Sequence, residues 1–150
     1  MSERADEAGD RLTELVDEVF RLSDTLARAG DAIVAEEGLS ASRWRTLGAI
    51  TAGPLSVAEI ARRRGMRRQS ASESVAQLEA AGLLVRTPDP RDARAPLVSL
   101  TAAGRETLRR IRPRRKAWAA HTARIATVEE LTAAVGLARR LRAELEAAER

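Results

Sequence analysis

The chain has 150 residues, 44% of them hydrophobic and 32% charged, which is the composition of one folded domain and not of a disordered chain. It has no cysteine, which excludes disulfides, cysteine nucleophiles and iron–sulfur or cysteine–zinc sites. Its single histidine argues against a zinc site built from histidine ligands. The formal net charge is only +4, although the isoelectric point is about 11.0. Because 25 of the 26 basic residues are Arg, almost no group apart from Lys116 titrates between the lone His121 and the arginines, and this alone raises the isoelectric point.

The charge is strongly segregated along the chain. Residues 1–40 hold 11 acids and 4 Arg, a net charge of −7, whereas residues 41–120 hold 17 basic and 6 acidic residues, a net charge of +11. Residues 121–150 hold 5 of each and are neutral overall. An asymmetry of this size hints at contact with nucleic acid, and an arginine-rich solvated face is the plainer alternative.

Two amphipathic helices are predicted at the ends of the chain. Apolar residues recur at alternating spacings of 3 and 4 over residues 12–33, which indicates a long helix that ends near Gly38. The same spacings recur over residues 131–148, after a capping box at 127–130. Both stripes are too apolar to stay exposed, so they pack on each other within one chain or pair with a second copy in a two-fold dimer.

The middle of the chain predicts a helix-turn-helix. A short helix over residues 41–52 is ended by Gly53-Pro54, and a capping box at 56–59 then opens the next helix. Gly65 ends that helix, and a further helix runs over about residues 68–80. A short helix, a tight turn and a second helix form the arrangement whose second helix enters the major groove of DNA.

A β-hairpin is predicted directly after this second helix. Its strands are residues 83–85 and 97–100, and a charged, turn-rich loop over 87–96 joins them. A hairpin in this place is a wing, and an Arg at its tip can enter the narrow minor groove, where the negative potential is enhanced. A helix follows from Thr101, and Pro113 is expected to kink or break it.

These features resemble the MarR family of bacterial transcriptional regulators over about residues 10–148. The segments that carry the resemblance are Trp44-Arg45-Thr46-Leu47, Arg68-Gln69-Ser70, residues 78–86 and, most specifically, Asp92-Ala93-Arg94 with residues 97–104. The family wing often reads Asp-Arg-Arg, so any contact of the middle Arg is lost at Ala93. Arg67 stands where the family commonly has a Ser or Thr N-cap, so the helix is expected to start closer to Ser70, which has capping-box spacing to Glu73.

The resemblance implies a mainly α-helical, winged helix-turn-helix fold with a small β-hairpin wing. Residues 1–150 then form one domain, with dimerisation helices in 1–38 and 102–150 and the DNA-binding part in 40–101. Such proteins usually repress their own or neighbouring genes as homodimers, and often release double-stranded DNA on binding a small, commonly aromatic or phenolic, effector. We expect a cytoplasmic repressor on a pseudo-palindromic operator, with no cofactor, no metal, no membrane contact and no enzymatic activity.

Candidate DNA contacts lie in the second helix of the helix-turn-helix, before it and on the wing. The side chains expected to reach bases or phosphates are Arg62, Arg63, Arg67, Arg68, Gln69, Ser70, Ser72, Arg91 and Arg94. Arg94 is expected to enter the minor groove, and Asp92 to orient it by a salt bridge. For Ser70, helix capping is the alternative role.

A possible effector pocket is suggested by the aromatic residues and the histidine. They fall on helices that resemble those lining the family's pocket, and they are Phe20, Trp44, Trp118 and His121. Simple packing in the core or in an interface is the alternative for the two tryptophans.

Two function classes remain open at this point. The first is a DNA-binding regulator, and the second is a winged-helix module that binds another protein and whose basic face is incidental. Salt dependence separates them, because each neutralised phosphate adds about −0.9 to the slope of log K against log salt. The basic run at 109–116 is a solvated face or a further DNA contact. An enzyme fits poorly, since the sequence has no paired-carboxylate cleft signature, phosphate-binding glycine loop or nucleophile–His pair.

Overall fold

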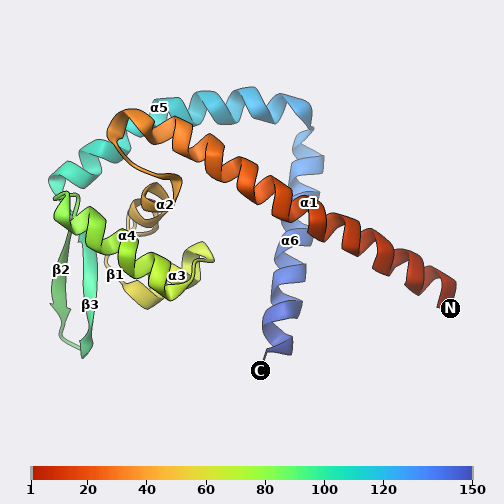
Figure 1. Ribbon diagram of the computed structural model, residues 1–150, viewed down its shortest axis with the longest axis horizontal. Coiled ribbons are helices and arrows are strands. Elements are labelled where there is room, and N and C mark those ends of the chain that lie inside the picture. The colour runs from red at the N-terminus through yellow and green to blue at the C-terminus, as the bar shows by residue number, and fades with distance from the viewer. Residues whose placement is uncertain (1, 150) are drawn as a thin grey trace. The chain divides into compact units, whose positions relative to one another are not determined.

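The computed structural model describes residues 2–149, with side chains from residue 4 onward, as two compact units that meet in sequence at Pro113 and Arg114 (Figure 1). The elements of the first unit are α1 (Ser2–Val34), the 3-10 turn η1 (Ala35–Glu37), α2 (Ala41–Ala49), β1 (Leu55–Ser56), α3 (Val57–Arg64), α4 (Arg68–Ala80), β2 (Leu84–Asp89), β3 (Asp92–Leu100) and the start of α5 (Ala102–Thr122). The second unit contains the rest of α5, the turn η2 (Ala123–Ile125) and α6 (Val128–Ala148). The described helices include none that is both long and apolar enough to cross a membrane.

The first helix packs on α2 through its last turns only. Gly30 is buried at this crossing, where an added Cβ would lie 2.8 Å from the Cβ of Ala41. Next to it, the backbone N–H of Ala41 donates a hydrogen bond of 2.7 Å to Oδ1 of Asp31. The chain leaves α1 through η1 and Gly38, whose left-handed φ of 66° confirms that Gly38 closes this helical segment.

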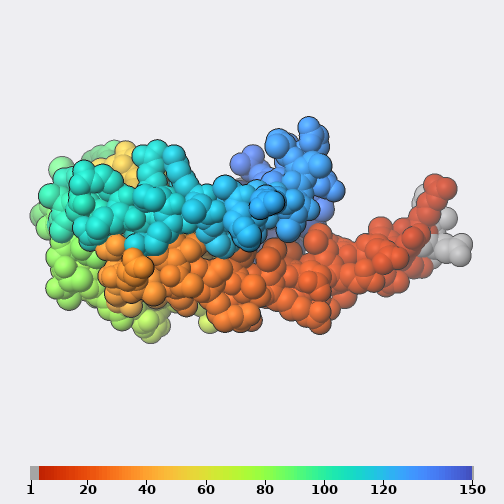
Figure 2. Space-filling view, turned by 90° about the horizontal axis from the view of Figure 1, so that it is seen from above, coloured from red at the N-terminus to blue at the C-terminus, as the bar shows by residue number. Residues whose placement is uncertain are grey.

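The apolar stripe of α1 is exposed over most of its length. Figure 2 shows this helix, in red and orange, with its side chains at the surface. The large apolar side chains of the stripe are 42–69% exposed and comprise Leu12, Val16, Val19, Phe20, Leu22 and Leu26. In the second unit α6 carries a comparable set, namely Val128, Leu131, Val135, Leu137 and Leu145. The two expected amphipathic helices are therefore present, and both present apolar side chains to solvent.

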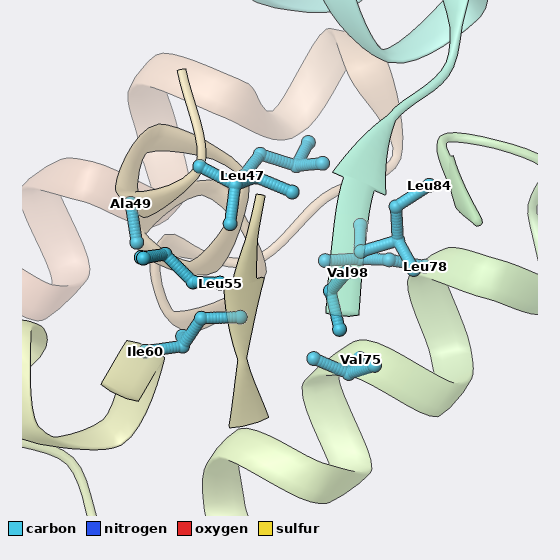
Figure 3. Packing of buried hydrophobic residues seen from close by; sticks show 9 residues of the cluster. Leu47, Ala49, Leu55, Ile60, Val75, Leu78, Leu84 and Val98 are labelled. Atoms are coloured by element: carbon cyan, nitrogen blue, oxygen red, sulfur yellow. The ribbon is translucent and has the colours of Figure 1, made fainter. Parts of the chain in front are cut away.

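The hydrophobic core lies inside the helix-turn-helix and draws on six elements: α2, β1, α3, α4, β2 and β3 (Figure 3). Its most deeply buried members come from α2, α3, α4, β2 and β3, and they are Leu47, Ile60, Val75, Leu78, Leu84 and Val98. Full burial of a side chain of this size contributes roughly 1.5–3 kcal/mol. Because no element brings a core of its own, the helices and the hairpin hold one another in place.

The sheet is antiparallel with strand order β1-β3-β2. The hairpin was expected, but the prediction of a long loop over 87–96 was wrong, because both strands extend through it and leave a tight turn. Pro88 is accommodated because β2 is an edge strand with a register irregularity between Thr87 and Asp89. The short strand β1 was not predicted, since it exists only through its pairing with Leu97 and Val98 of β3.

The predicted bounds of about 68–80 for the second helix of the helix-turn-helix are confirmed, but the expected shift of its start toward Ser70 and the expected break at Pro113 were wrong. Helix α4 begins at Arg68, with Arg67 as an N-cap that makes no side-chain capping bond, so the start does not move toward Ser70. The preceding turn decides this, because Gly65 is left-handed and the Met66 N–H donates back to α3. Helix α5 runs through Pro113 without a break, in a segment rich in good helix formers.

Candidate nucleic-acid interface

The start of α3 is fixed by the predicted capping box. The Oγ of Ser56 accepts a bond of 3.3 Å from the N–H of Glu59, and the Ser56 N–H donates at 2.8 Å to Oε2 of Glu59. The backbone and hydroxyl bonds from Ser56 lower the pKa of Glu59, with a smaller contribution from the charges of Arg62 and Arg63. These bonds to an ionised carboxylate fix where α3 begins, and so where its cationic last turn lies.

The turn between α3 and α4 is as tight as the sequence predicts. Gly65 has a φ of 58°, which a residue with a side chain rarely adopts. The N–H of Met66 reaches back to the carbonyl of Ala61 at 2.9 Å. The last turn of α3, with its arginines, is thereby held next to the first turn of α4.

The predicted DNA-contacting residues occupy the exposed sides of these elements. All nine are exposed, and all belong to the first unit. Helix α4 buries its opposite side through Ala71, Val75 and Leu78. Gln69 is held on its own helix by a 3.2 Å hydrogen bond from Nε2 to Oε1 of Glu73. The Ser70 side chain is exposed and makes no hydrogen bond with any residue that the structure describes, so it does not cap α4.

The wing tip is organised by two aspartates through backbone bonds. The Arg91 N–H donates to Oδ1 of Asp89 at 2.9 Å, and the Arg94 N–H donates to Oδ1 of Asp92 at 3.0 Å. The expected salt bridge between the Asp92 and Arg94 side chains is not among the ion pairs of the described residues. Asp92 instead fixes the backbone of Arg94, whose side chain is exposed.

The sequence offers Arg64, with Arg62 and Arg63, as a phosphate contact, but it did not show that Arg64 lies next to Arg45. Arg64 at the end of α3 lies over Gly48 of α2, where an added Cβ would be 2.9 Å from a terminal nitrogen of Arg64. Arg45 donates a hydrogen bond to the carbonyl of Arg64. Burial, and then the charge of Arg45, lower the pKa of Arg64. Its buried Nε has no hydrogen-bond partner among the described residues. A glycine inside a predicted helix was the only sign of this packing.

The residues of the predicted effector pocket are divided between the two units. Phe20 on α1 is 69% exposed, and Trp44 on α2 is half-buried in the first unit. Trp118 is half-buried and His121 is exposed, both on the part of α5 that belongs to the second unit. A pocket that combines these four residues therefore stays a prediction.

The chain is similar to transcription regulators over most of its length. A family model described as MarR family matches residues 37–95. An uncharacterised protein of Mycobacterium bovis is 34% identical over 105 residues, which is 70% of this chain and 73% of that protein. The transcriptional activatory protein BadR of Rhodopseudomonas palustris is 32% identical over 108 residues, 67% of this chain and 62% of BadR.

The fold agrees with this family as well. The crystal structure of the PcaV transcriptional regulator from Streptomyces coelicolor, solved in complex with its natural ligand, superposes with a TM-score of 0.73 at 26% identity. The match covers 83% of this chain and 88% of PcaV. With the helix-turn-helix, the wing and the exposed cations in place, the chain belongs to the MarR family of winged-helix, DNA-binding transcription regulators.

Proposed function

We propose that this regulator binds a pseudo-palindromic duplex as a homodimer and represses transcription from it. The observation that carries the proposal is the gathering of exposed cationic and polar residues on α3, α4 and the wing of one rigidly packed unit. The surrounding segment, residues 41–120, has a net charge of +11. A surface of this charge and shape matches the phosphate backbone and grooves of duplex DNA.

Within this interface the side chains fall into three groups, according to the part of the duplex that each would contact. Gln69, Ser70 and Ser72 stand on the exposed side of the first turns of α4, where a recognition helix meets base edges. The arginines around the turn, at 62–63 and 67–68, suit phosphates, and the second pair also suits guanine. Arg94 and Arg91 at the wing tip suit the minor groove and its flanking phosphates.

The pair of Arg45 and Arg64 supplies a further anion contact in this proposal. The charge of Arg45 opposes that of Arg64, because the two guanidinium groups are held next to each other. A phosphate oxygen of the DNA backbone would offset this repulsion. The side chain that packs over Gly48 would then position the duplex without reading its sequence.

The exposed apolar stripes support the homodimer. Six large apolar side chains on α1 and five on α6 lie at the surface of the single chain. Contiguous apolar surface of this kind marks an interface in soluble proteins. A two-fold dimer would place two copies of α4 one helical turn of DNA apart, about 34–36 Å.

Repression and its relief are the finer parts of the proposal. A dimer bound across a promoter excludes polymerase and so represses transcription. Because the relative BadR is described as an activator, repression as opposed to activation needs its own test. The natural ligand bound to PcaV supports control by a ligand here, and the effector we propose is a small aromatic or phenolic compound. In vitro transcription from a promoter that carries the DNA sequence bound by the protein, with and without such a compound, tests both repression and its relief.

Selection of bound sequences from random duplex DNA tests the central claim. We expect two related half-sites with centres 10–10.5 base pairs apart, and a steep fall of affinity with salt. The competing function, a protein-binding winged helix, predicts no measurable duplex binding even at low salt. That result would overturn the proposal, whereas tight binding without sequence preference would remove only its sequence-specific part.

A further inference from the structure

An ion pair joins the segment that leads into the helix-turn-helix to the helix that follows the wing. Glu37 lies in η1, between α1 and α2, and Arg110 lies on α5, 73 residues further along the chain. Nε and Nη2 of Arg110 donate to Oε2 of Glu37 at 3.1 and 2.9 Å. Both residues belong to the first unit, so the pair connects its entry segment directly with its exit helix.

The pair is more enclosed than an ordinary surface salt bridge. The Glu37 side chain is only 10% exposed, and Nη2 of Arg110 also donates at 3.3 Å to the hydroxyl of the buried Thr107. The hydrogen bond to Glu37 is the largest influence that raises the pKa of Arg110. Arg110 therefore has an internal partner, and its role differs from the two left open for the basic run at 109–116.

Other contacts hold the entry and exit segments one at a time. At the entry, Oδ1 of Asp31 accepts the Ala41 N–H at 2.7 Å, which ties α1 to α2. At the exit, the Thr101 hydroxyl donates at 2.7 Å to the carbonyl of Gly82, which ties the start of α5 to the turn after α4. Arg110 lies farther along α5, about 13 Å from Thr101 at a rise of about 1.5 Å per residue. An ion pair at that distance limits how far α5 can pivot about its first turn.

We propose that Glu37 and Arg110 are positioning residues that set the separation of the two α4 helices in the homodimer. This inference rests on the proposed function, in which α1 and α6 form the dimer interface, because α5 leads into α6. The buried Ile111 also keeps α5 close to the rest of the unit, but apolar packing has no fixed direction. Two hydrogen bonds to one carboxylate oxygen do have a direction, and they fix the angle between η1 and α5. Without them, each α4 would move more freely and the dimer would accept more than one half-site spacing.

Two duplexes measure this effect on DNA binding. One carries the sequence that the random-duplex selection returns, and the other has one base pair added between its half-sites, which moves them apart by about 3.4 Å and turns them by about 34°. Glu37→Ala removes the acceptor, and Glu37→Gln keeps the shape of the side chain without its charge. Glu106→Ala is the matched control, because Glu106 pairs with Arg110 at 3.6 Å from within α5 and links it to no other element.

The native chain should lose affinity about tenfold or more when the base pair is added. Glu37→Ala should bind the selected sequence several-fold more weakly, yet lose only about threefold or less on the longer duplex, because a looser dimer follows both spacings. Glu37→Gln should fall between these cases, and Glu106→Ala should behave like the native chain. Equal weakening of Glu37→Ala on both duplexes would overturn the proposal, since lost stability or charge does not depend on spacing. The same result for Glu106→Ala as for Glu37→Ala would also overturn it.

A second measurement needs the dimer but no DNA. The chain has no cysteine, so Gln77→Cys at an exposed position of α4 carries one spin label per copy. Double electron–electron resonance should give a narrow distribution of distances between the two labels, which broadens with Glu37→Ala and not with Glu106→Ala. An unchanged width would overturn this inference. Failure of the native chain to bind duplex would instead overturn the proposed function, and a monomeric native chain would overturn both.

Discussion

Gly104 and Leu83 approach each other more closely than any residue with a side chain would allow. A Cβ on Gly104 would lie 2.0 Å from the carbonyl oxygen of Leu83. The same oxygen accepts a 3.2 Å bond from the Thr101 N–H, and the Thr101 hydroxyl donates at 2.7 Å to the carbonyl of Gly82. The first turn of α5 is thus held directly against the turn between α4 and β2.

Gly104→Ala is therefore expected to destabilise the first unit. The new methyl group meets a backbone carbonyl that cannot move without loosening the Thr101 bonds, so the free energy of unfolding should fall by about 2 kcal/mol or more. Urea denaturation followed by circular dichroism measures this. Gly9→Ala is the matched control, because among the described residues no atom outside its own stretch of helix backbone lies within 4 Å of the added Cβ. An equal effect of the two changes would contradict the close approach.

The helical part of the fold could be predicted because its signals are local. The spacings along α1 and α6 and the capping boxes at 56–59 and 127–130 each depend on residues within one or two turns. The ends of β2 and β3 could not be predicted in the same way. Their pairing carries the strands through Pro88 and Pro96, and β1 is a strand only because Leu55 meets Val98 far along the chain.

In the candidate interface, too, features that depend on local sequence could be predicted and features that depend on packing between distant residues could not. Exposed arginines and the wing could be found from charge and chain order, because their role requires only exposure on the right element. The environment of Arg64 could not, since it arises from the packing of α3 over Gly48. The role of Asp92 was also misjudged, because its carboxylate bonds the Arg94 backbone and not the side chain.

The capping box of α3 predicts a pH-dependent contribution to stability. The pKa of Glu59 is lowered below 4.5 in the folded chain by the bonds from Ser56. The folded state therefore binds this proton less readily than the unfolded chain, and the contribution is present above about pH 4.5 and is lost as the pH falls below it. Glu59→Gln should lower Tm at pH 7, and the difference from the native chain should close as the pH falls.

Thermal melts at several pH values between 7 and 3.5 check this expectation. Glu144→Gln, at an exposed carboxylate of α6 with no part in a capping box, gives the baseline for removing one charge. A Tm difference for Glu59→Gln that stays constant over the whole range would show that the carboxylate charge does not strengthen the cap.

The stripe on α1 should control the oligomeric state. Leu22 is 55% exposed in the single chain, so Leu22→Glu should preserve the folded monomer and dissociate the proposed dimer by placing a charge in its interface. Light scattering after gel filtration measures the mass. Arg28→Glu introduces the same side chain on the opposite side of the helix and should leave the dimer intact. A Leu22→Glu protein that remains dimeric at micromolar concentration would exclude this stripe from the interface.

At the wing, Arg94→Ala should weaken binding to the selected duplex several-fold without changing dimerisation. The expected loss is that of one cation in the minor groove, and the salt slope should become shallower by about 1. Asp92→Asn keeps an oxygen that can accept the Arg94 N–H and should bind nearly as well as the native chain, whereas Asp92→Ala removes the acceptor and should weaken binding. Fluorescence anisotropy at several salt concentrations gives both quantities. Unchanged affinity for Arg94→Ala would remove the wing contact from the interface.

Sequence preference should depend on Gln69 more than on the arginines beside it. Its amide nitrogen is bonded to Oε1 of Glu73 in the free protein, so reading a base requires exchanging that bond for one to a base edge. Gln69→Ala should relax the preference at one position in each half-site, with a discrimination loss of about 1–3 kcal/mol. Arg63→Ala is the comparison, because the arginines at 62–63 are assigned to phosphates alone and loss of a phosphate contact weakens all sequences about equally. Repeating the random-duplex selection with both variants decides the matter: a uniform loss for Gln69→Ala, with an unaltered consensus, would assign that residue to positioning on the backbone.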